Sequence, residues 1–68
     1  MYKLKVKEYR VEKEWSQKEL AIRSGVSQSA ISYIEHSERN PSIDTIAKLG
    51  IALGISPHDL IVFHDYDK

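Results

Sequence analysis

Apolar residues recur at helical spacing along most of the chain, with short polar or glycine-containing breaks between the periodic segments. A serine stands just ahead of four of these segments, where its side chain can cap a helix: Ser16, Ser27, Ser42 and Ser56. Gly25 follows the end of one segment, where glycine readily takes a left-handed backbone. This punctuation predicts five helices, one before residue 16 and the others at about 17–24, 28–36, 43–53 and from 57 onward.

Only one stretch alternates as a strand would, Lys3–Lys7, in which lysines flank Leu4 and Val6. It is short and has no apparent partner run, so the sequence predicts no strand. Each expected helix is too short to be stable alone and must be held by packing. The expected fold is therefore all-α, a compact five-helix domain that takes in residues 1–68, with a short acidic tail at about 64–68.

The length and composition narrow the class of protein. The 68 residues include no cysteine, which excludes disulfides, thiolate metal sites and a cysteine nucleophile. The longest apolar run, Leu60–Phe63, is far short of the roughly 20 residues that span a bilayer, and the N-terminus lacks the apolar stretch of a signal peptide. We therefore expect a cytoplasmic protein with no membrane partner. So short a chain has little room for a catalytic pocket, which favours a binding module over an enzyme.

The charge is zero in total and uneven in distribution. Residues 1–23 carry seven basic side chains against four acidic ones, whereas residues 51–68 carry one basic side chain against three acidic ones. Local potential matters more than the sum, so the basic front end leaves an anionic partner open. A solvated surface of mixed charge is the alternative interpretation of the same pattern.

Two short helices joined by a tight turn, over about residues 16–36, have the pattern of a helix-turn-helix. Ala21 is small where the helices would cross, and Gly25 supplies the positive φ of the turn. Val26, Ile31 and Ile34 are expected to face inward, with Leu20 opposite them. By periodicity alone, an ordinary pair of antiparallel helices fits as well.

Residue identities from about Val6 to Leu60 resemble the phage-repressor (Cro/C1, Xre-type) helix-turn-helix family. The matching pieces keep the family's spacing: Arg10, SQ-EL at Ser16–Leu20, GVS at Gly25–Ser27, IS-IE at Ile31–Glu35, R-PS at Arg39–Ser42 and LG-S at Leu53–Ser56. The resemblance implies a lambda-repressor-like fold and a DNA-binding regulator. The chain departs from it at two sites where the family favours residues that accept a left-handed backbone: Glu14, and His36 with Ser37.

The second helix of the motif is the one that enters the major groove in this family. Its first two turns present polar residues that we expect to read bases: Gln28, Ser29, Ser32 and Tyr33. A glutamine can pair with both adenine N6 and N7, and a tyrosine can stack on a thymine methyl group or bond to a phosphate. For the two serines, a merely solvated helix face is an equally good interpretation.

Phosphate contacts are expected around the motif. Gln17 and Lys18 open a helix whose N-terminal amides attract an anion. The resemblance adds the loop residues Arg39, Asn40 and Ser42, which would lie along the DNA backbone. It also implies that Arg10 pairs with Glu35, with the remaining arginine donors facing a phosphate. Two unrelated surface charges are the alternative to that structural ion pair.

Several apolar residues do not fit a small core: Ile22, Ile51, Ile61, Val62 and Phe63. Because the C-terminal helix and tail often form the dimer interface in the resembling family, we expect the last four to line a homodimer contact, with Phe63 as its anchor. The alternative is a well-packed lid on the core.

These features together predict a sequence-specific regulator of transcription, a repressor that binds a two-fold symmetric operator in double-stranded DNA as a homodimer. No catalytic residue, metal site or cofactor is expected. Two rivals stay open: an antitoxin with the same DNA-binding module, and a helix-turn-helix adaptor that contacts only proteins. A protein partner, such as a toxin or an anti-repressor, is compatible with both the repressor and the antitoxin.

Overall fold

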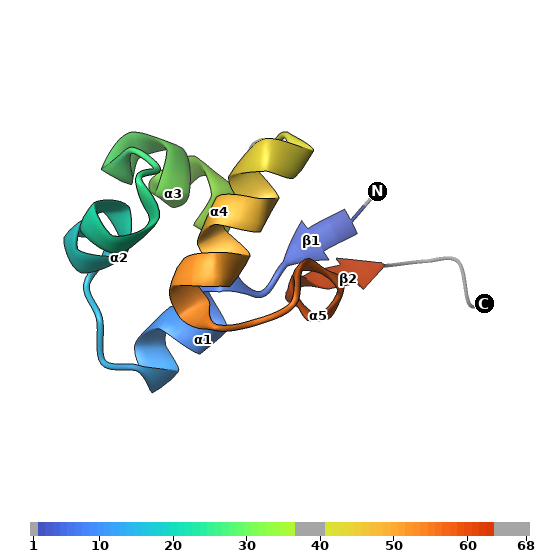
Figure 1. The fold of residues 1–68 in the computed structure, drawn as a ribbon, viewed down its shortest axis with the longest axis horizontal. Helices are drawn as coiled ribbons and strands as arrows, with labels where there is room; N and C mark the ends of the chain where they lie inside the picture. The colour runs from blue at the N-terminus through green and yellow to red at the C-terminus, as the bar shows by residue number, and fades with distance from the viewer. Residues whose placement is uncertain (1, 37–40, 64–68) are drawn as a thin grey trace.

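A computed structural model describes residues 2–36 and 41–63, and the side chains of residues 4–36 and 41–61. Its helices occur in the predicted places: α1 (Val6–Glu12), α2 (Gln17–Ser24), α3 (Gln28–Glu35), α4 (Ile43–Leu53) and α5 (Pro57–Leu60). Figure 1 shows α2 and α3 at one end of the molecule, α4 across its middle, and the two short strands at residues 2–4 and 61–63 at the other end. The prediction of a compact five-helix domain is confirmed.

Serine side chains begin four of the helices, as the sequence predicts. Their hydroxyl oxygens accept hydrogen bonds from first-turn amides: Ser16 from Glu19, Ser27 from Ala30, Ser42 from Thr45 and Ser56 from His58. At the end of α2 the backbone takes a left-handed turn at Gly25, with a φ of 78°. These local bonds satisfy amides that an α-helix leaves without partners, so each short helix starts at a defined residue.

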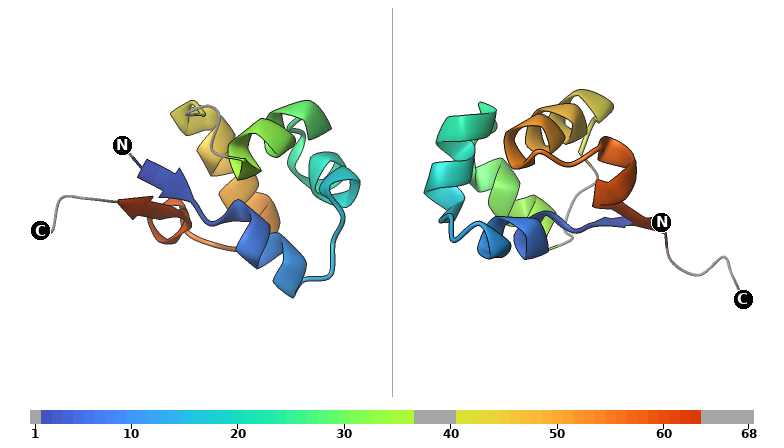
Figure 2. Two further views of the ribbon diagram at one scale, coloured as in Figure 1. Left: turned by 180° about the vertical axis from the view of Figure 1, so that it is seen from behind. Right: turned by 60° about the horizontal axis from the view of Figure 1, so that its bottom comes forward.

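The prediction that the chain has no strand is wrong. Residues Tyr2–Leu4 form strand β1 and Ile61–Phe63 form strand β2, which pair antiparallel with Leu4 opposite Ile61. The ladder continues where the amide of Lys5 donates to the carbonyl of Leu60 at 2.8 Å. Both views in Figure 2 show this ribbon projecting from the helical body. The alternation around Leu4 does have a partner run, and it lies at the opposite end of the chain.

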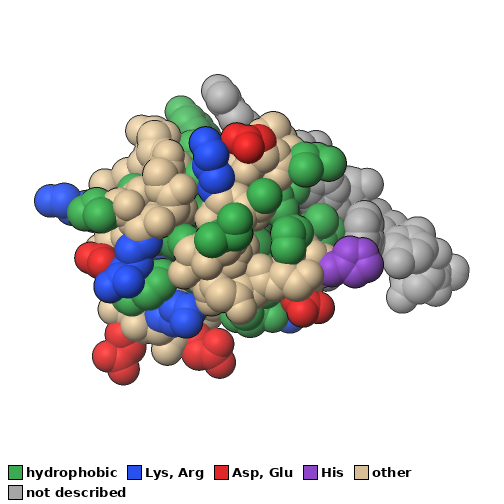
Figure 3. Space-filling model, viewed as in Figure 1, with side chains coloured by type: hydrophobic (Ala, Val, Ile, Leu, Met, Phe, Trp, Pro, Cys, Tyr) green, Lys and Arg blue, Asp and Glu red, His purple; other side chains and the backbone are tan. Residues whose placement is uncertain are grey.

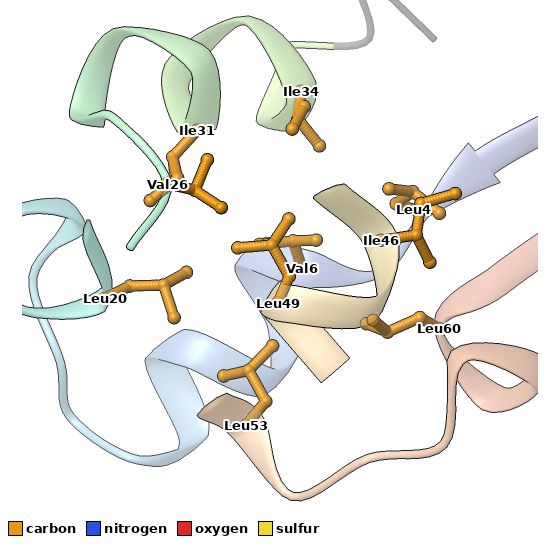
Figure 4. Packing of buried hydrophobic residues seen from close by; sticks show 10 residues of the cluster. All are labelled: Leu4, Val6, Leu20, Val26, Ile31, Ile34, Ile46, Leu49, Leu53 and Leu60. Atoms are coloured by element: carbon orange, nitrogen blue, oxygen red, sulfur yellow. The ribbon is translucent and has the colours of Figure 1, made fainter. Parts of the chain in front are cut away.

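One hydrophobic core joins all five helices to β1. Leu20 of α2, Ile31 of α3 and Leu49 of α4 are fully buried, and Val26 and Ile34 are nearly so. Figure 4 shows α4 passing through the middle of this cluster, with side chains of the other elements pointing toward it. The inward orientation predicted for the helix-turn-helix residues is confirmed, and it fixes α2 against α3.

The two departures from the family pattern have different outcomes. Glu14 adopts a φ of 61°, a left-handed conformation that favours glycine. At the end of α3, His36 has a φ of −93°, and its amide donates to the carbonyl of Ser32, so the helix finishes without a left-handed residue. Ser37 lies outside the described residues. The turn between α1 and α2 therefore carries backbone strain, and the end of α3 does not.

Replacing Glu14 with glycine should stabilise the protein. The substitution relieves a left-handed non-glycine residue, which costs about 1–2 kcal/mol, and loses somewhat less through the flexibility of glycine in the unfolded chain. We expect a net gain of about 0.5–1 kcal/mol, measured by urea denaturation. The control, Glu12→Gly in the last turn of α1, should destabilise by about 0.5–1 kcal/mol. Loss of stability in Glu14→Gly would show that the turn is unstrained.

Candidate nucleic-acid interface

The first turn of α2 presents backbone donors to the surface. Ser16 caps the amide of Glu19, whereas the amides of Gln17 and Lys18 have no acceptor among the described residues. The side chain of Lys18 is exposed beside them. Free amides at the positive end of the helix dipole, next to a lysine, form an environment suited to a phosphate group.

The outer side of α3 carries the four residues predicted to read bases. At about 100° per residue, Gln28, Ser29, Ser32 and Tyr33 share an arc of about 140°, and the buried residues Ile31 and Ile34 occupy the other side. Gln28 and Ser29 are exposed, Ser32 is half-buried, and the exposed fraction of Tyr33 is 42%. The structure therefore brings these residues together on one polar, uncharged face.

A single carboxylate joins three of the helices. Glu35, the last residue of α3, accepts hydrogen bonds from Arg10 Nε at 2.7 Å, Arg10 Nη2 at 3.0 Å and Gln17 Nε2 at 3.0 Å. The Nη1 group of the same arginine donates to the carbonyl oxygen of Trp15 at 2.7 Å. Side-chain exposure is only 12% for Arg10 and 3% for Glu35. The structure thus brings Arg10 and Glu35 into a bidentate pair and adds Gln17 to it.

The charges of this cluster support one another. Burial alone would raise the pKa of Glu35, but hydrogen bonds from Arg10 and Gln17, with the positive charges of Arg10 and Lys7, hold that pKa below its ordinary value. The hydrogen bond to Glu35 raises the pKa of Arg10. The stabilisation from Glu35 is therefore complete above its ordinary pKa and is lost as the pH falls through its lowered pKa.

The other predicted phosphate ligands fare differently. Three of the five N–H groups of Arg10 donate inside the protein, which gives this residue a structural role, and a phosphate contact by its remaining N–H groups stays a prediction. The hydroxyl of Ser42 caps α4 and donates to Thr45 Oγ1, which leaves its donor occupied as well. Arg39 and Asn40 lie outside the described residues.

A basic residue that the sequence analysis missed lies beside this cluster. Lys7 is exposed on α1 and lies close enough to Glu35 for its charge to lower the pKa of that carboxyl group. Lys7 precedes Arg10 by three residues, so both fall on one side of the same helix. That spacing is the signal that would have found it.

Two cations flank the aromatic residue that precedes α2. Lys13 Nζ lies 5.4 Å and Arg23 Cζ 4.4 Å from the centroid of the Trp15 ring. Arg23 also pairs with Glu19 one turn earlier on α2. These cation–π contacts hold the turn between α1 and α2 against the helix that it precedes.

The residues predicted for a dimer contact do not behave alike. Ile51 on α4 is 81% exposed, whereas Ile61 is half-buried and packs against the core. The side chains of Val62 and Phe63 lie outside the described set. Ile22 is 69% exposed, and Ile43 at the start of α4 is 83% exposed. Large apolar groups therefore remain on the surface of α2 and α4, apart from the polar face of α3.

Over residues 2–36 and 41–63 no helix is long and apolar enough to cross a membrane. The same residues contain no cluster of three or more histidine, aspartate or glutamate side chains that could hold a metal ion.

The fold and the paired helices α2 and α3 define a helix-turn-helix domain. Residues 6–60 match the family model described as helix-turn-helix. The chain belongs to this helix-turn-helix family, of the Cro/C1 (Xre) type.

Curated relatives agree with the family assignment. The chain is 41% identical over 58 residues to the HTH-type transcriptional regulator SinR of Bacillus subtilis, covering 84% of this chain and 52% of SinR. It is 42% identical over 60 residues to control protein C.BamHI of Bacillus amyloliquefaciens, covering 87% of this chain and 74% of the relative. The chain spans about half the length of SinR.

Solved structures of SinR match the fold. The N-terminal DNA-binding domain of SinR from Bacillus subtilis superposes with a TM-score of 0.80 at 37% identity, over 94% of this chain and 91% of that one. SinR in complex with DNA matches with a TM-score of 0.76 at 42% identity, over 79% of this chain and 87% of that one. The complex of SinR with SinI matches with a TM-score of 0.78 at 41% identity, over 81% and 54%.

Removal of one member of the Arg10–Glu35 pair should be strongly destabilising. Arg10→Met leaves a nearly buried carboxylate without its partner, so we expect a loss of about 3–5 kcal/mol in urea denaturation at neutral pH. The double variant Arg10→Met/Glu35→Met leaves no uncompensated charge and should lose less than the sum of the two single variants. Additive losses in this double-mutant cycle would contradict an energetic coupling between the two residues.

Proposed function

We propose that this protein is a transcriptional regulator that binds a specific sequence in double-stranded DNA through α3. The observation that carries the proposal is the uncharged polar face of Gln28, Ser29, Ser32 and Tyr33, held in a fixed relation to the anion-binding first turn of α2. The solved complex of SinR with DNA, whose chain matches this one at 42% identity, supports the proposal. A regulator of this kind acts in the cytoplasm and carries no catalytic group.

In this proposal α3 contacts the bases and α2 contacts a phosphate. The side chains of α3 enter the major groove, where Gln28 pairs with a base edge and the serines adapt to neighbouring groups. The first turn of α2 binds a phosphate through the amides of Gln17 and Lys18, and the side chain of Lys18 adds a positive charge. Lys7 supplies a second exposed charge near the end of α3, and Arg39 and Asn40 remain expected backbone contacts from the family resemblance.

A neutral chain has little long-range attraction for DNA, which favours binding by two copies. With as many acidic as basic residues, one copy makes few charged phosphate contacts. We propose a homodimer that reads two half-sites of a two-fold symmetric operator, spaced by about one helical turn of DNA. Of the two predicted contacts whose side chains the structure describes, Ile51 and Ile61, Ile51 is the exposed one. Figure 3 shows hydrophobic side chains at the surface of the face on which α4 lies.

A protein partner is a second candidate for this apolar surface. SinR forms a complex with SinI, and the exposed isoleucines of α2 and α4 offer a surface that the DNA-binding face does not use. An antitoxin would combine both contacts. An adaptor that contacts only proteins would lack the affinity for duplex DNA that we expect.

Gln28→Ala should remove sequence discrimination while leaving weak binding to random duplexes at low salt. A base contact by glutamine contributes about 1–3 kcal/mol, so we expect affinity for the selected duplex to fall by about 5- to 150-fold. Binding is measured by fluorescence anisotropy on a duplex selected from random DNA and on a scrambled duplex.

The matched control is Lys18→Ala, a change in a phosphate contact. It should weaken both duplexes by the same factor and reduce the slope of log affinity against log salt by about one unit. If Gln28→Ala weakens both duplexes equally, Gln28 does not read a base. No measurable binding of the wild type to any duplex would reject the function.

Ile51→Asp should abolish the homodimer without unfolding the protein. Ile51 is 81% exposed, so a charge there disturbs no core contact, but it would be buried without a partner in an apolar interface. We expect a monomer in sedimentation equilibrium, with unchanged helical content and a steep loss of operator affinity. Ile51→Leu, the conservative control, should remain dimeric. If the Ile51→Asp variant remains dimeric, Ile51 does not lie in the dimer interface.

A further inference from the structure

The side chain of Gln17 already makes a hydrogen bond within the protein in the absence of DNA. Its Nε2 group donates to Glu35 Oε1 at 3.0 Å, and a glutamine amide nitrogen carries two N–H groups. We propose that Glu35 is a positioning residue for DNA binding, which holds the Gln17 amide by one N–H so that the other is presented to a backbone phosphate. The inference rests on the proposed function, because it assigns a role within the same phosphate site.

The anchor is rigid enough for this task. The side chain of Glu35 is 3% exposed, and both of its carboxylate oxygens accept from Arg10, whose third nitrogen donates to the Trp15 carbonyl just before α2. Gln17 is the first residue of α2, so its side chain leaves the helix beside the free amides of Gln17 and Lys18. The amide group that Glu35 holds and the backbone donors thus belong to one first turn.

The charge around the carboxylate allows a phosphate nearby. An isolated carboxylate would repel the DNA backbone, but Arg10 binds Glu35 through two nitrogens, and the exposed Lys7 adds a second positive charge. The neighbourhood of Glu35 is therefore net positive. A neutral amide can bridge the two anions without adding charge of its own.

Anchoring should matter because a free glutamine side chain loses rotamer freedom when it binds. A side chain ordered in the unbound protein does not lose it again on the DNA. Glu35 is also the last residue of α3, so the anchor ties the phosphate contact of α2 to the helix that reads bases. The phosphate contact of α2 and the base contacts of α3 are then held in a fixed position relative to each other.

A double-mutant cycle on DNA affinity tests the proposal. Gln17→Ala is measured in the wild type and in Arg10→Met/Glu35→Met, which lacks the anchor and leaves no uncompensated charge. Anisotropy titrations on the selected duplex are made where circular dichroism shows each variant folded. We expect Gln17→Ala to lower affinity about 3- to 10-fold in the wild type, as for one hydrogen bond, and less than about 2-fold without the anchor. Lys18→Ala is the matched control, with the same loss in both backgrounds.

Three results would overturn the proposal. An equal loss from Gln17→Ala in both backgrounds means that Gln17 contacts DNA without help from Glu35. A larger loss without the anchor means that Glu35 competes with the phosphate. No loss in the wild type means that the Gln17 side chain makes no contact, although the protein still binds DNA. A wild type that binds no duplex rejects the proposed function together with the inference, so the two failures differ.

A measurement on the wild type alone guards against variants that do not fold. The side-chain amide of Gln17 should be rigid on the nanosecond scale in nitrogen-15 relaxation of the DNA-free protein, and that of the exposed Gln28 should be mobile. Equal mobility of the two amides would remove the anchor and the proposal with it.

Discussion

A nearly buried negative charge at the end of α3 is the constraint on which the arrangement of the helices depends. Removing a carboxylate from water is expensive unless it is paired and hydrogen-bonded. Glu35 obtains its partners from Arg10 on α1 and Gln17 on α2, and Arg10 also holds the carbonyl of Trp15. Satisfying this one group therefore sets α1, the turn after it, the start of α2 and the end of α3 relative to one another.

The same constraint separates structural charges from charges open to a ligand. Arg10 uses three of its five N–H groups inside the protein, and Arg23 is held by Glu19 and Trp15. Lys7 and Lys18 remain exposed, Lys7 near Glu35 and Lys18 next to Gln17. A chain without net charge can thus still offer a local positive surface, because its acidic groups are placed elsewhere or compensated.

The exposed isoleucines lie apart from the polar face of α3. One side of α4 packs into the core. Leu4 of β1 and Ile61 of β2 add to the same core beside the four-residue helix α5. Ile43 and Ile51 stay exposed on α4, where contact with another molecule would remove them from water. Contact with a partner and contact with DNA are therefore proposed on separate surfaces of one small domain.

Local signals in the sequence were sufficient for the helices and for the exposed face of α3. A serine cap, the left-handed glycine at Gly25 and the periodicity of Ile31 and Ile34 each depend on residues within about one helical turn. Tertiary structure alone decided the pairing of β1 with β2, which joins opposite ends of the chain and turned Ile61 toward the core. It also decided that Gln17 and Arg10 both donate to Glu35. Hydrogen bonds between helices depend on how the helices cross, and residue spacing along the chain does not determine the crossing.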